Sequence, residues 1–339
     1  MYEEAWAVGD VDAVVFDEFH YMNDPDRGTV WEESVIYSPP HVRLVALSAT
    51  MSNAEEVRDW FRAVHGPTAG VVSDHRPVPL RFSFCDRDGL VPLFAPPRGG
   101  APASSSLASM RAAKLHPSVL ASLANEVARA GEGGGGGKSA LRAFGDRRRR
   151  FAGRRGDDAT SGAPRGAAAE RRGGRRDKFA AVPSFPYVVR ALRRRDMLPA
   201  IVFVFSRAGC DRAAAAAATE ETGFVDDDEA AALRSRVAAF AAAYPDVADA
   251  GRMELARVGI ASHHAGLLPL WKSFVEELFQ AGLLKVVFAT ETLAAGINMP
   301  ARTTVLSALS KRGDDGIGPL TTSQVLQMAG RAGRRGMDA

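Results

Sequence analysis

The chain has 339 residues, 46% of them hydrophobic and 24% charged, which is the composition of a globular protein long enough for two domains. Its apolar runs, such as Leu198–Phe205, are far too short to cross a bilayer. The two cysteines, Cys85 and Cys210, fit no metal-binding or redox spacing and indicate a reducing compartment.

The formal net charge of +3 is distributed unevenly along the chain. Residues 138–178 hold fourteen Lys and Arg against five Asp and Glu, a net +9, so the rest of the chain carries −6. The globular part is therefore mildly acidic, and the overall charge does not indicate what it binds.

The first region, residues 1–94, alternates short β-branched runs with helical patterns. Ala13–Phe16 and Val42–Leu47 are each too short for a helix and are predicted to be buried strands. The run Ser52–Glu55 has the pattern of a capping box, so we expect a helix to begin there with Ser52 as its N-cap. The apolar face of this helix consists of Val57, Trp60, Phe61 and Val64.

Two short motifs follow these predicted strands. Asp17-Glu18-Phe19-His20 comes directly after the first strand, where paired carboxylates can hold Mg²⁺ and activate a water for nucleotide hydrolysis. Ser48-Ala49-Thr50 follows the second strand, where its hydroxyls can bond a neighbouring loop. An acidic turn and a helix cap are the simpler interpretations of the two motifs, and neither motif is specific by itself.

The middle region, residues 95–179, is dominated by Gly, Ala, Ser, Pro and Arg. Gly133–Gly137 is an unbroken glycine run and Arg147–Arg150 an unbroken arginine run. Such a segment buries too little apolar surface to offset the entropy of ordering it. We therefore predict that most of it is disordered, with a modest helix around Leu115–Ala130 compatible with the sequence.

The last region, residues 180–339, again alternates strand and helix patterns, which implies βαβ units and a parallel sheet. The predicted strands are Ile201–Phe205, Val258–Ser262, Lys285–Ala289 and Thr303–Ser307. The predicted helices are Asp211–Thr219, Glu229–Ala243 and Leu270–Gln280.

Three further motifs lie in this last region. Gln327–Gly336 interleaves arginines with glycines, which suits close contact with phosphate, although a flexible basic tail has the same composition. Ala289–Pro300 offers hydroxyls and a glycine that can contact a sugar–phosphate backbone without reading bases. The adjacent pair His263-His264 has no cysteine or carboxylate to complete a ligand set, so we do not expect a metal site there.

The order of the motifs is more specific than any one of them. DEFH, SAT, IVFVFSR, HHAGLLP, ATETLAAGINMP and QMAGRAGRRG follow one another in the order of motifs II, III, IV, IVa, V and VI of superfamily 2 helicases. The chain resembles the superkiller-type DExH-box branch of that superfamily. Over Asp17–Phe84, which includes DRGTVWEES and RPVPLRFSF, it looks most similar to cyanobacterial and chloroplast members.

The resemblance implies an α/β fold of two RecA-like parallel-sheet lobes of the P-loop NTPase type, joined through the basic low-complexity insertion. It implies an ATP-dependent RNA helicase that uses ATP and Mg²⁺ and binds RNA or DNA largely independently of sequence, with no membrane involved. A chloroplast location rests on the resemblance alone, and the alternative is a cytoplasmic or nuclear location. Protein partners are not indicated.

The resemblance also assigns roles to residues of motifs II and VI. Asp17 would hold Mg²⁺ through water, and Glu18 would be the general base. His20 would couple the nucleotide site to Gln327. Phe19 stands where the family more often has Val or Cys, and we expect its side chain to point back towards the sheet.

The remaining assignments fall into three groups. Coupling would be assisted by Ser48 and Thr50. The nucleotide would be contacted by Gly296, Asn298, Arg331 and Arg334, with Arg334 as the arginine finger. Nucleic-acid phosphates would be contacted by Ser206, Arg207, Gly266 and Thr290.

The chain departs from the family pattern in one respect that bears on activity. No G-x-x-x-x-G-K-[ST] segment precedes Asp17. Gly137-Lys138-Ser139 has the right ending, but Glu132 occupies the position of the first glycine, and the segment follows motif III. We therefore expect the chain to be a fragment, truncated in its first lobe and ending soon after motif VI, that does not hydrolyse ATP by itself.

Several alternatives stay open at this point. The basic insertion is a solvated linker, an arginine–glycine tether for RNA, or translated intron sequence. The parent protein is an RNA helicase or a DNA helicase of the repair branch. A non-catalytic nucleic-acid-binding remnant is the alternative outside the enzymes.

Overall fold

The computed structural model has two compact units, residues 1–80 together with 192–339, and residues 81–191. The structure describes residues 10–23, 28–48, 51, 53–73, 76–86, 88–95, 113–121, 183–220, 224–294, 299–313, 316–334 and 336–338. No helix in this described part of the chain is both long and apolar enough to span a membrane.

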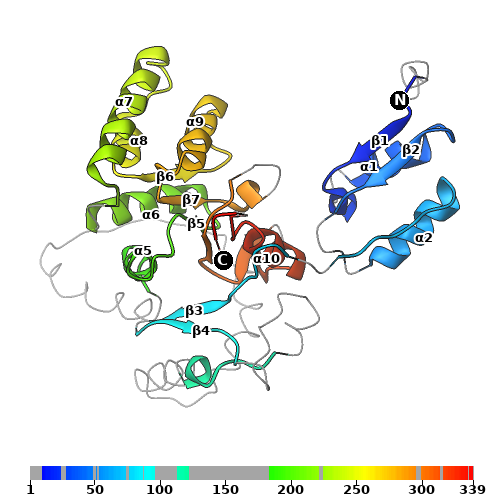
Figure 1. Cartoon of the computed structure of the whole chain (residues 1–339), viewed down its shortest axis with the longest axis horizontal. Helices are drawn as coiled ribbons and strands as arrows, with labels where there is room; N and C mark the ends of the chain where they lie inside the picture. The colour runs from blue at the N-terminus through cyan, green and yellow to red at the C-terminus, as the bar shows by residue number, and fades with distance from the viewer. Residues whose placement is uncertain are drawn as a thin grey trace, which may run out of the picture. The chain divides into compact units, whose positions relative to one another are not determined.

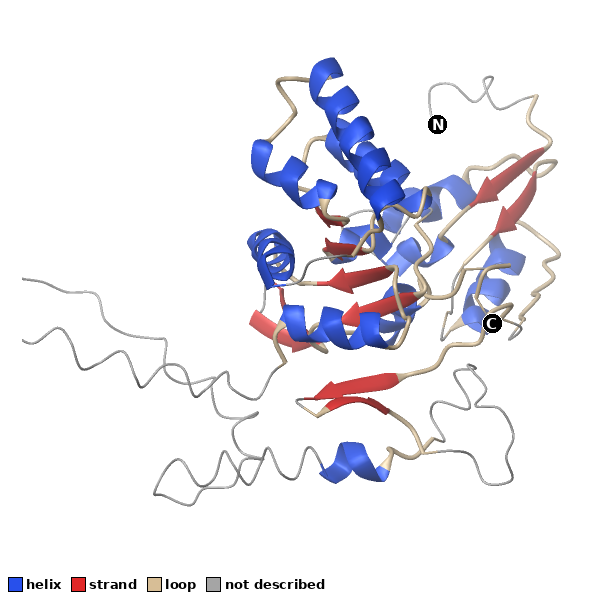
Figure 2. Ribbon diagram, turned by 60° about the vertical axis from the view of Figure 1, so that its left-hand side comes forward, coloured by secondary structure: helices blue, strands red, loops and turns tan. Residues whose placement is uncertain are grey.

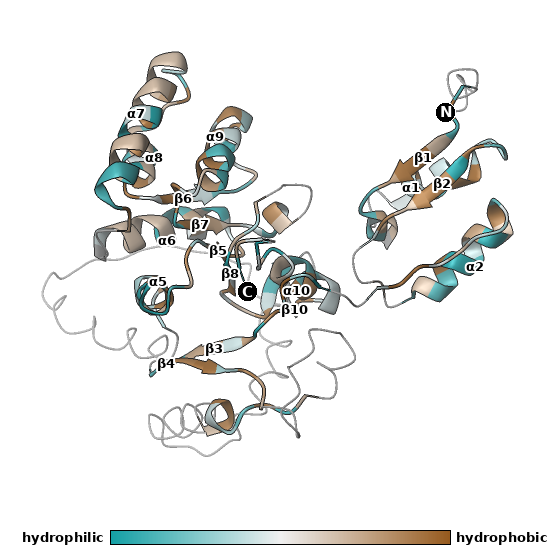
Figure 3. Ribbon diagram, in the orientation of Figure 1, coloured by the Kyte–Doolittle hydropathy of each residue, from teal (hydrophilic) through white to brown (hydrophobic). Residues whose placement is uncertain are grey.

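The N-terminal part of the first unit is built on two parallel strands, β1 (Ala13–Phe16) and β2 (Arg43–Ala46), with Ala13 opposite Arg43 (Figure 1). The 3-10 helix η2 (Phe19–Asn23) and α1 (Gly28–Ile36) make the crossover between them, as a parallel pair requires. A small core forms where Phe16, Phe19, Val35 and Phe61 are buried together. Figure 3 shows the hydrophobic residues that run along β1.

Helix α2 (Ala54–Val64) follows β2 and differs from the prediction at its start. Its N-cap is Asn53, which makes no side-chain capping bond, so the expectation that Ser52 begins a capping box is wrong. The helix starts one residue later and carries Glu55 and Glu56 in its first turn, where negative charge favours the helix dipole.

The C-terminal part of the first unit contains a four-stranded parallel sheet in the order β6-β7-β5-β8. The strands are β5 (Ala200–Phe203), β6 (Ile260–His263), β7 (Val286–Ala289) and β8 (Thr303–Leu306). Every residue of β5, β6 and β7 is buried, which is typical of a parallel sheet covered on both faces. The predicted parallel sheet and α/β fold are therefore confirmed.

Helices flank this sheet (Figure 2). They are α6 (Arg207–Glu220), α7 (Asp227–Ala243), α8 (Ala250–Arg257), α9 (Pro269–Gln280), the 3-10 helix η6 (Glu291–Ala294) and α10 (Thr322–Ala329). Aromatic side chains pack between two of these helices: Phe240 of α7 stacks on Phe274 of α9, with 4.3 Å between the ring centroids. An antiparallel hairpin of β9 (Ser310–Gly313) and β10 (Gly316–Pro319) precedes α10.

The predicted strand Val258–Ser262 begins two residues too early. Val258 is the C-cap of α8, and Gly259 adopts a left-handed φ of +81° that ends the helix. The strand therefore begins at Ile260, where the backbone becomes extended and the side chain is fully buried.

The second unit contains the antiparallel pair β3 (Ser83–Asp86) and β4 (Gly89–Pro92), extended by a bridge between Phe94 and Leu115. Helix α5 (Phe185–Arg194) begins in this unit. The predicted disorder of residues 95–179 lies outside the described residues, except for residue 95 and residues 113–121, where 117–121 are helical.

Candidate nucleotide and nucleic-acid site

The acidic pair of motif II lies at the carboxyl end of β1, on a turn with an unusual backbone. Glu18 adopts a φ of +53°, a left-handed conformation that is costly for a residue other than glycine. Its amide donates a hydrogen bond of 2.9 Å to Oδ1 of Asp17, and the next amide, that of Phe19, donates one of 2.8 Å to the carbonyl of Leu47 beyond β2. The turn exposes Asp17 and leaves Glu18 half-buried.

Phe19 anchors this turn in the hydrophobic core. Its side chain is 1% exposed, and its ring centroid lies 5.7 Å from that of Phe16, 6.1 Å from Trp31 and 5.2 Å from Phe61. The expectation that this side chain points back towards the sheet is confirmed. Its neighbours Glu18 and His20 are half-buried, and their side chains make polar contacts instead.

A series of polar contacts connects motif II with motif VI. Nδ1 of His20 lies 3.3 Å from Oε2 of Glu18, and Nε2 of His20 lies 3.3 Å from the amide nitrogen of Gln327 on α10. If the Gln327 amide donates, Nε2 accepts and the imidazole proton sits on Nδ1, which is buried 3.3 Å from the carboxylate without the geometry of a hydrogen bond to it. Helix α10 is fixed at its start by a reciprocal capping box between Thr321 and Gln324.

Arg331 lies near the acidic turn. Its Nε donates a 2.9 Å hydrogen bond to the carbonyl of Ala294, at the end of η6, and its Nη2 donates to the same oxygen. Burial lowers the pKa of the Arg331 guanidinium, and the negative charge of Glu18 opposes that shift. Glu18, His20, Gln327 and Arg331 thus form one polar cluster.

Arg334 instead pairs with Asp338. Its Nε and Nη2 donate to the two carboxylate oxygens at 3.1 and 2.9 Å, and its backbone amide donates to Oδ2 at 2.8 Å. These bonds raise the pKa of Arg334 and hold the pKa of Asp338 below its usual value. Sequence reasoning missed Asp338, because a spacing of four residues indicates an ion pair only on a helix, and Arg334 and Asp338 lie beyond the end of α10.

The four residues expected at nucleic-acid phosphates follow three neighbouring strands of the parallel sheet. Ser206 and Arg207 follow β5, Gly266 follows β6 and Thr290 follows β7, so all four lie at the same edge. A Cβ at Gly266 would lie 3.2 Å from Cδ of Arg207, which places the glycine backbone directly against that side chain. Such an edge offers a cation, hydroxyls and open backbone, as contacts to phosphate require.

The two adjacent histidines bind carboxylates from different helices. Nε2 of His263 lies 2.9 Å from Oε1 of Glu276 on α9, and Nε2 of His264 lies 3.3 Å from both carboxylate oxygens of Asp211 on α6. Burial lowers the pKa of His263, although Glu276 opposes that shift. The amide of Gly266 donates to Nδ1 of His264, so this histidine also shapes the loop after β6.

Three expected site residues, Thr50, Gly296 and Asn298, lie outside the described residues. Ser48 is described and is exposed at the end of the segment that follows β2. Among the residues that the structure describes, no group of three or more His, Cys, Asp or Glu side chains could hold a metal ion.

Two family models match the chain. One is described as DEAD/DEAH box helicase and matches residues 1–57, and the other is described as helicase conserved C-terminal domain and matches residues 234–336. These matches cover motifs II and III in one part and motifs IVa, V and VI in the other. They agree with the parallel α/β fold and define the class of the two matched parts as helicase domains.

Comparison with individual proteins defines the class more narrowly. The chain is 43% identical over 97% of its length to the chloroplastic DExH-box ATP-dependent RNA helicase DExH15 of Arabidopsis thaliana, of which it covers 26%. It is 39% identical over its full length to the probable helicase HelY of Mycobacterium tuberculosis and 35% identical to the antiviral helicase SKI2 of Saccharomyces cerevisiae, covering 33% and 27% of them. The chain belongs to the superkiller-type DExH-box helicases of superfamily 2 and spans about a quarter to a third of these relatives.

Proposed function

We propose that this chain carries motifs II to VI of an ATP-dependent RNA helicase, which hydrolyses ATP to move along RNA and unwind it. The observation that carries the proposal is the polar cluster of Glu18, His20, Gln327 and Arg331, which connects motif II with motif VI. Nδ1 of His20 lies 3.3 Å from Oε2 of Glu18, and its Nε2 lies 3.3 Å from the amide nitrogen of Gln327. The name of the Arabidopsis thaliana relative, an ATP-dependent RNA helicase, supports it.

Asp17 and two residues of the cluster have chemical roles in this proposal. Asp17 is an exposed carboxylate at a parallel strand end, and such a hard oxygen donor fits a hydrated Mg²⁺. Bound ATP with Mg²⁺ supplies the phosphoryl group that is transferred to water. Glu18 accepts the proton of the attacking water, and Arg331 balances the negative charge that develops in the transition state.

Arg334 is the proposed arginine finger, and its guanidinium is paired with Asp338 in this structure. The guanidinium has to exchange at least one carboxylate oxygen of Asp338 for a phosphate oxygen. Because the Arg334 side chain is 20% exposed, it is accessible for that exchange.

RNA is the proposed substrate, held by Ser206, Arg207, Gly266 and Thr290 through its phosphates, with little sequence preference. The name of the Arabidopsis relative extends the proposal to a chloroplast location, which a fluorescent fusion of the full-length protein tests. A DNA helicase of the repair branch and a non-catalytic binding protein remain the rival functions, since contacts to phosphate do not distinguish sugars.

Unwinding of matched RNA and DNA duplexes by the full-length protein separates these functions. The proposal predicts ATP-dependent unwinding of the RNA duplex that is lost in Glu18→Gln. Unwinding of DNA alone would establish the repair-type function. Binding without ATP-dependent unwinding of either duplex would establish the non-catalytic function.

A further inference from the structure

One arginine outside the helicase motifs holds the backbone of motif VI. Nη2 of Arg76 donates to the carbonyl of Gly330 at 3.2 Å and to that of Ala332 at 2.6 Å, and its Nε donates to the carbonyl of Val78 at 2.9 Å. The side chain is half-buried, and burial lowers the pKa of its guanidinium. A charge that is partly removed from water has to be compensated by such hydrogen bonds.

The carbonyls that Arg76 binds lie just beyond the end of α10, where helical bonding stops. The carbonyl between them, that of Arg331, accepts a 2.9 Å bond from the amide of Ala301, and the amide of Gly333 returns a 2.8 Å bond to the carbonyl of Ala301. Three successive carbonyls of motif VI thus have fixed partners, two of them on a single side chain.

The segment that carries Arg76 also packs closely against motif VI. Gly333 has a φ of +91°, and a Cβ at this position would lie 2.9 Å from Cβ of Val78. Only glycine fits there without displacing Val78. The turn that leads from Arg331 to Arg334 is therefore enclosed by Ala301 on one side and by the Arg76 segment on the other.

We propose that Arg76 is a positioning residue, which fixes the backbone on both sides of Arg331 and so places the motif VI arginines for phosphoryl transfer. This inference rests on the proposed ATPase function, to which it adds a residue from outside the known motifs. Arginine suits the role because its planar fork bonds two carbonyls at once, whereas lysine presents a single point charge.

The first test needs no nucleotide and uses the 339-residue chain. Hydrogen exchange is measured at the amides of Ala301 and Gly333, whose bonds depend on the turn that Arg76 holds. Loss of the charged hydrogen bonds in Arg76→Gln should increase exchange about 10- to 100-fold at both amides, with a smaller increase in Arg76→Lys.

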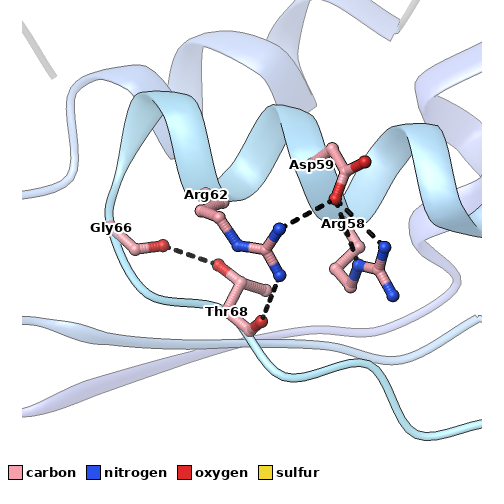
Figure 4. Close-up of polar contacts among 5 residues, drawn as sticks. All are labelled: Arg58, Asp59, Arg62, Gly66 and Thr68. Atoms are coloured by element: carbon pink, nitrogen blue, oxygen red, sulfur yellow. Dashed lines mark hydrogen bonds and ion pairs between the residues drawn. The ribbon is translucent and has the colours of Figure 1, made fainter.

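The matched control is Arg62→Gln on α2. Arg62 is also an arginine that donates to a backbone carbonyl, that of Thr68 at 3.5 Å, and it pairs with Asp59 at 3.2 Å (Figure 4). This variant should leave exchange at Ala301 and Gly333 unchanged. Equal exchange in Arg76→Gln and the wild type would overturn the proposal.

The second test measures ATP turnover by the full-length protein. Arg76→Gln should lower kcat about tenfold while KM for ATP stays within about twofold, because a misplaced arginine weakens the transition state rather than ATP binding. In an Arg331→Ala background Arg76→Gln should have no further effect on kcat, since the two residues act as one unit.

Equal losses of kcat in both backgrounds would show that Arg76 only supports the fold, and the positioning role would then be wrong. If the wild-type protein shows no ATP turnover at all, the proposed function fails and the positioning role fails with it. The exchange measurement distinguishes the two failures, because it shows whether Arg76 holds the turn without any catalysis.

Discussion

Replacing Phe19 with alanine removes the side chain that anchors the acidic turn of motif II. Phe19 is 1% exposed and contacts three aromatic rings, so the substitution leaves a cavity in a core with four buried members among the described residues. A buried Phe→Ala change costs about 3–5 kcal/mol. We expect about 3 kcal/mol here, because the partly buried neighbours of so small a core can close part of the cavity.

Urea unfolding of the 339-residue chain, followed by tryptophan fluorescence, measures this cost, since Trp31 and Trp60 border the same core. Val15→Ala is the control, because that side chain is 61% exposed on β1 and its loss should change stability by less than about 0.5 kcal/mol. A cost below about 1 kcal/mol for Phe19→Ala would refute the argument that this residue fixes the turn.

Three further predictions concern titratable groups. Burial raises the pKa of Cys210 to about 12, so a thiol reagent at pH 8 should label Cys85 rapidly and Cys210 only after denaturation. Burial keeps His263 neutral in the fold, and it gains a proton on unfolding below about pH 6.5. The free energy of unfolding should therefore fall between pH 7 and 5.5 more steeply in the wild type than in His263→Gln. Arg334 lowers the pKa of Asp338, so Asp338→Asn should cost about 1–3 kcal/mol at pH 7. That cost should shrink as the pH falls below about 4, and a cost independent of pH would contradict the pairing.

The strands and the fold class were predictable because their signals are local. Ala13–Phe16 is a strand over the predicted residues, as its short apolar run indicates. The expectation that β1 and β2 are buried is wrong, because Phe16 is the one buried residue of β1 and no residue of β2 is buried. The ends of elements were less predictable. Ser52 and Asn53 are both good N-cap residues, and only the packing of α2 decides between them.

The contacts within the candidate site were only partly predictable. The order of the motifs associates His20 with Gln327, and the structure brings these residues to 3.3 Å. No local sequence pattern associates Arg76 with Gly330, which is 254 residues away. Arg76 binds backbone carbonyls, and every residue type has a backbone carbonyl, so the sequence gives no sign of the partner. Such contacts become visible only when the backbone is known.

Hydrolysis of ATP by the full-length protein, with and without RNA, tests the central claim most directly. The account predicts RNA-stimulated phosphate release that falls by about 10²- to 10⁴-fold in Glu18→Gln, while ATP binding is retained, because only the general base is lost. It also predicts no release from the 339 residues in isolation. Absence of hydrolysis in the full-length wild type, or full turnover in Glu18→Gln, would contradict it.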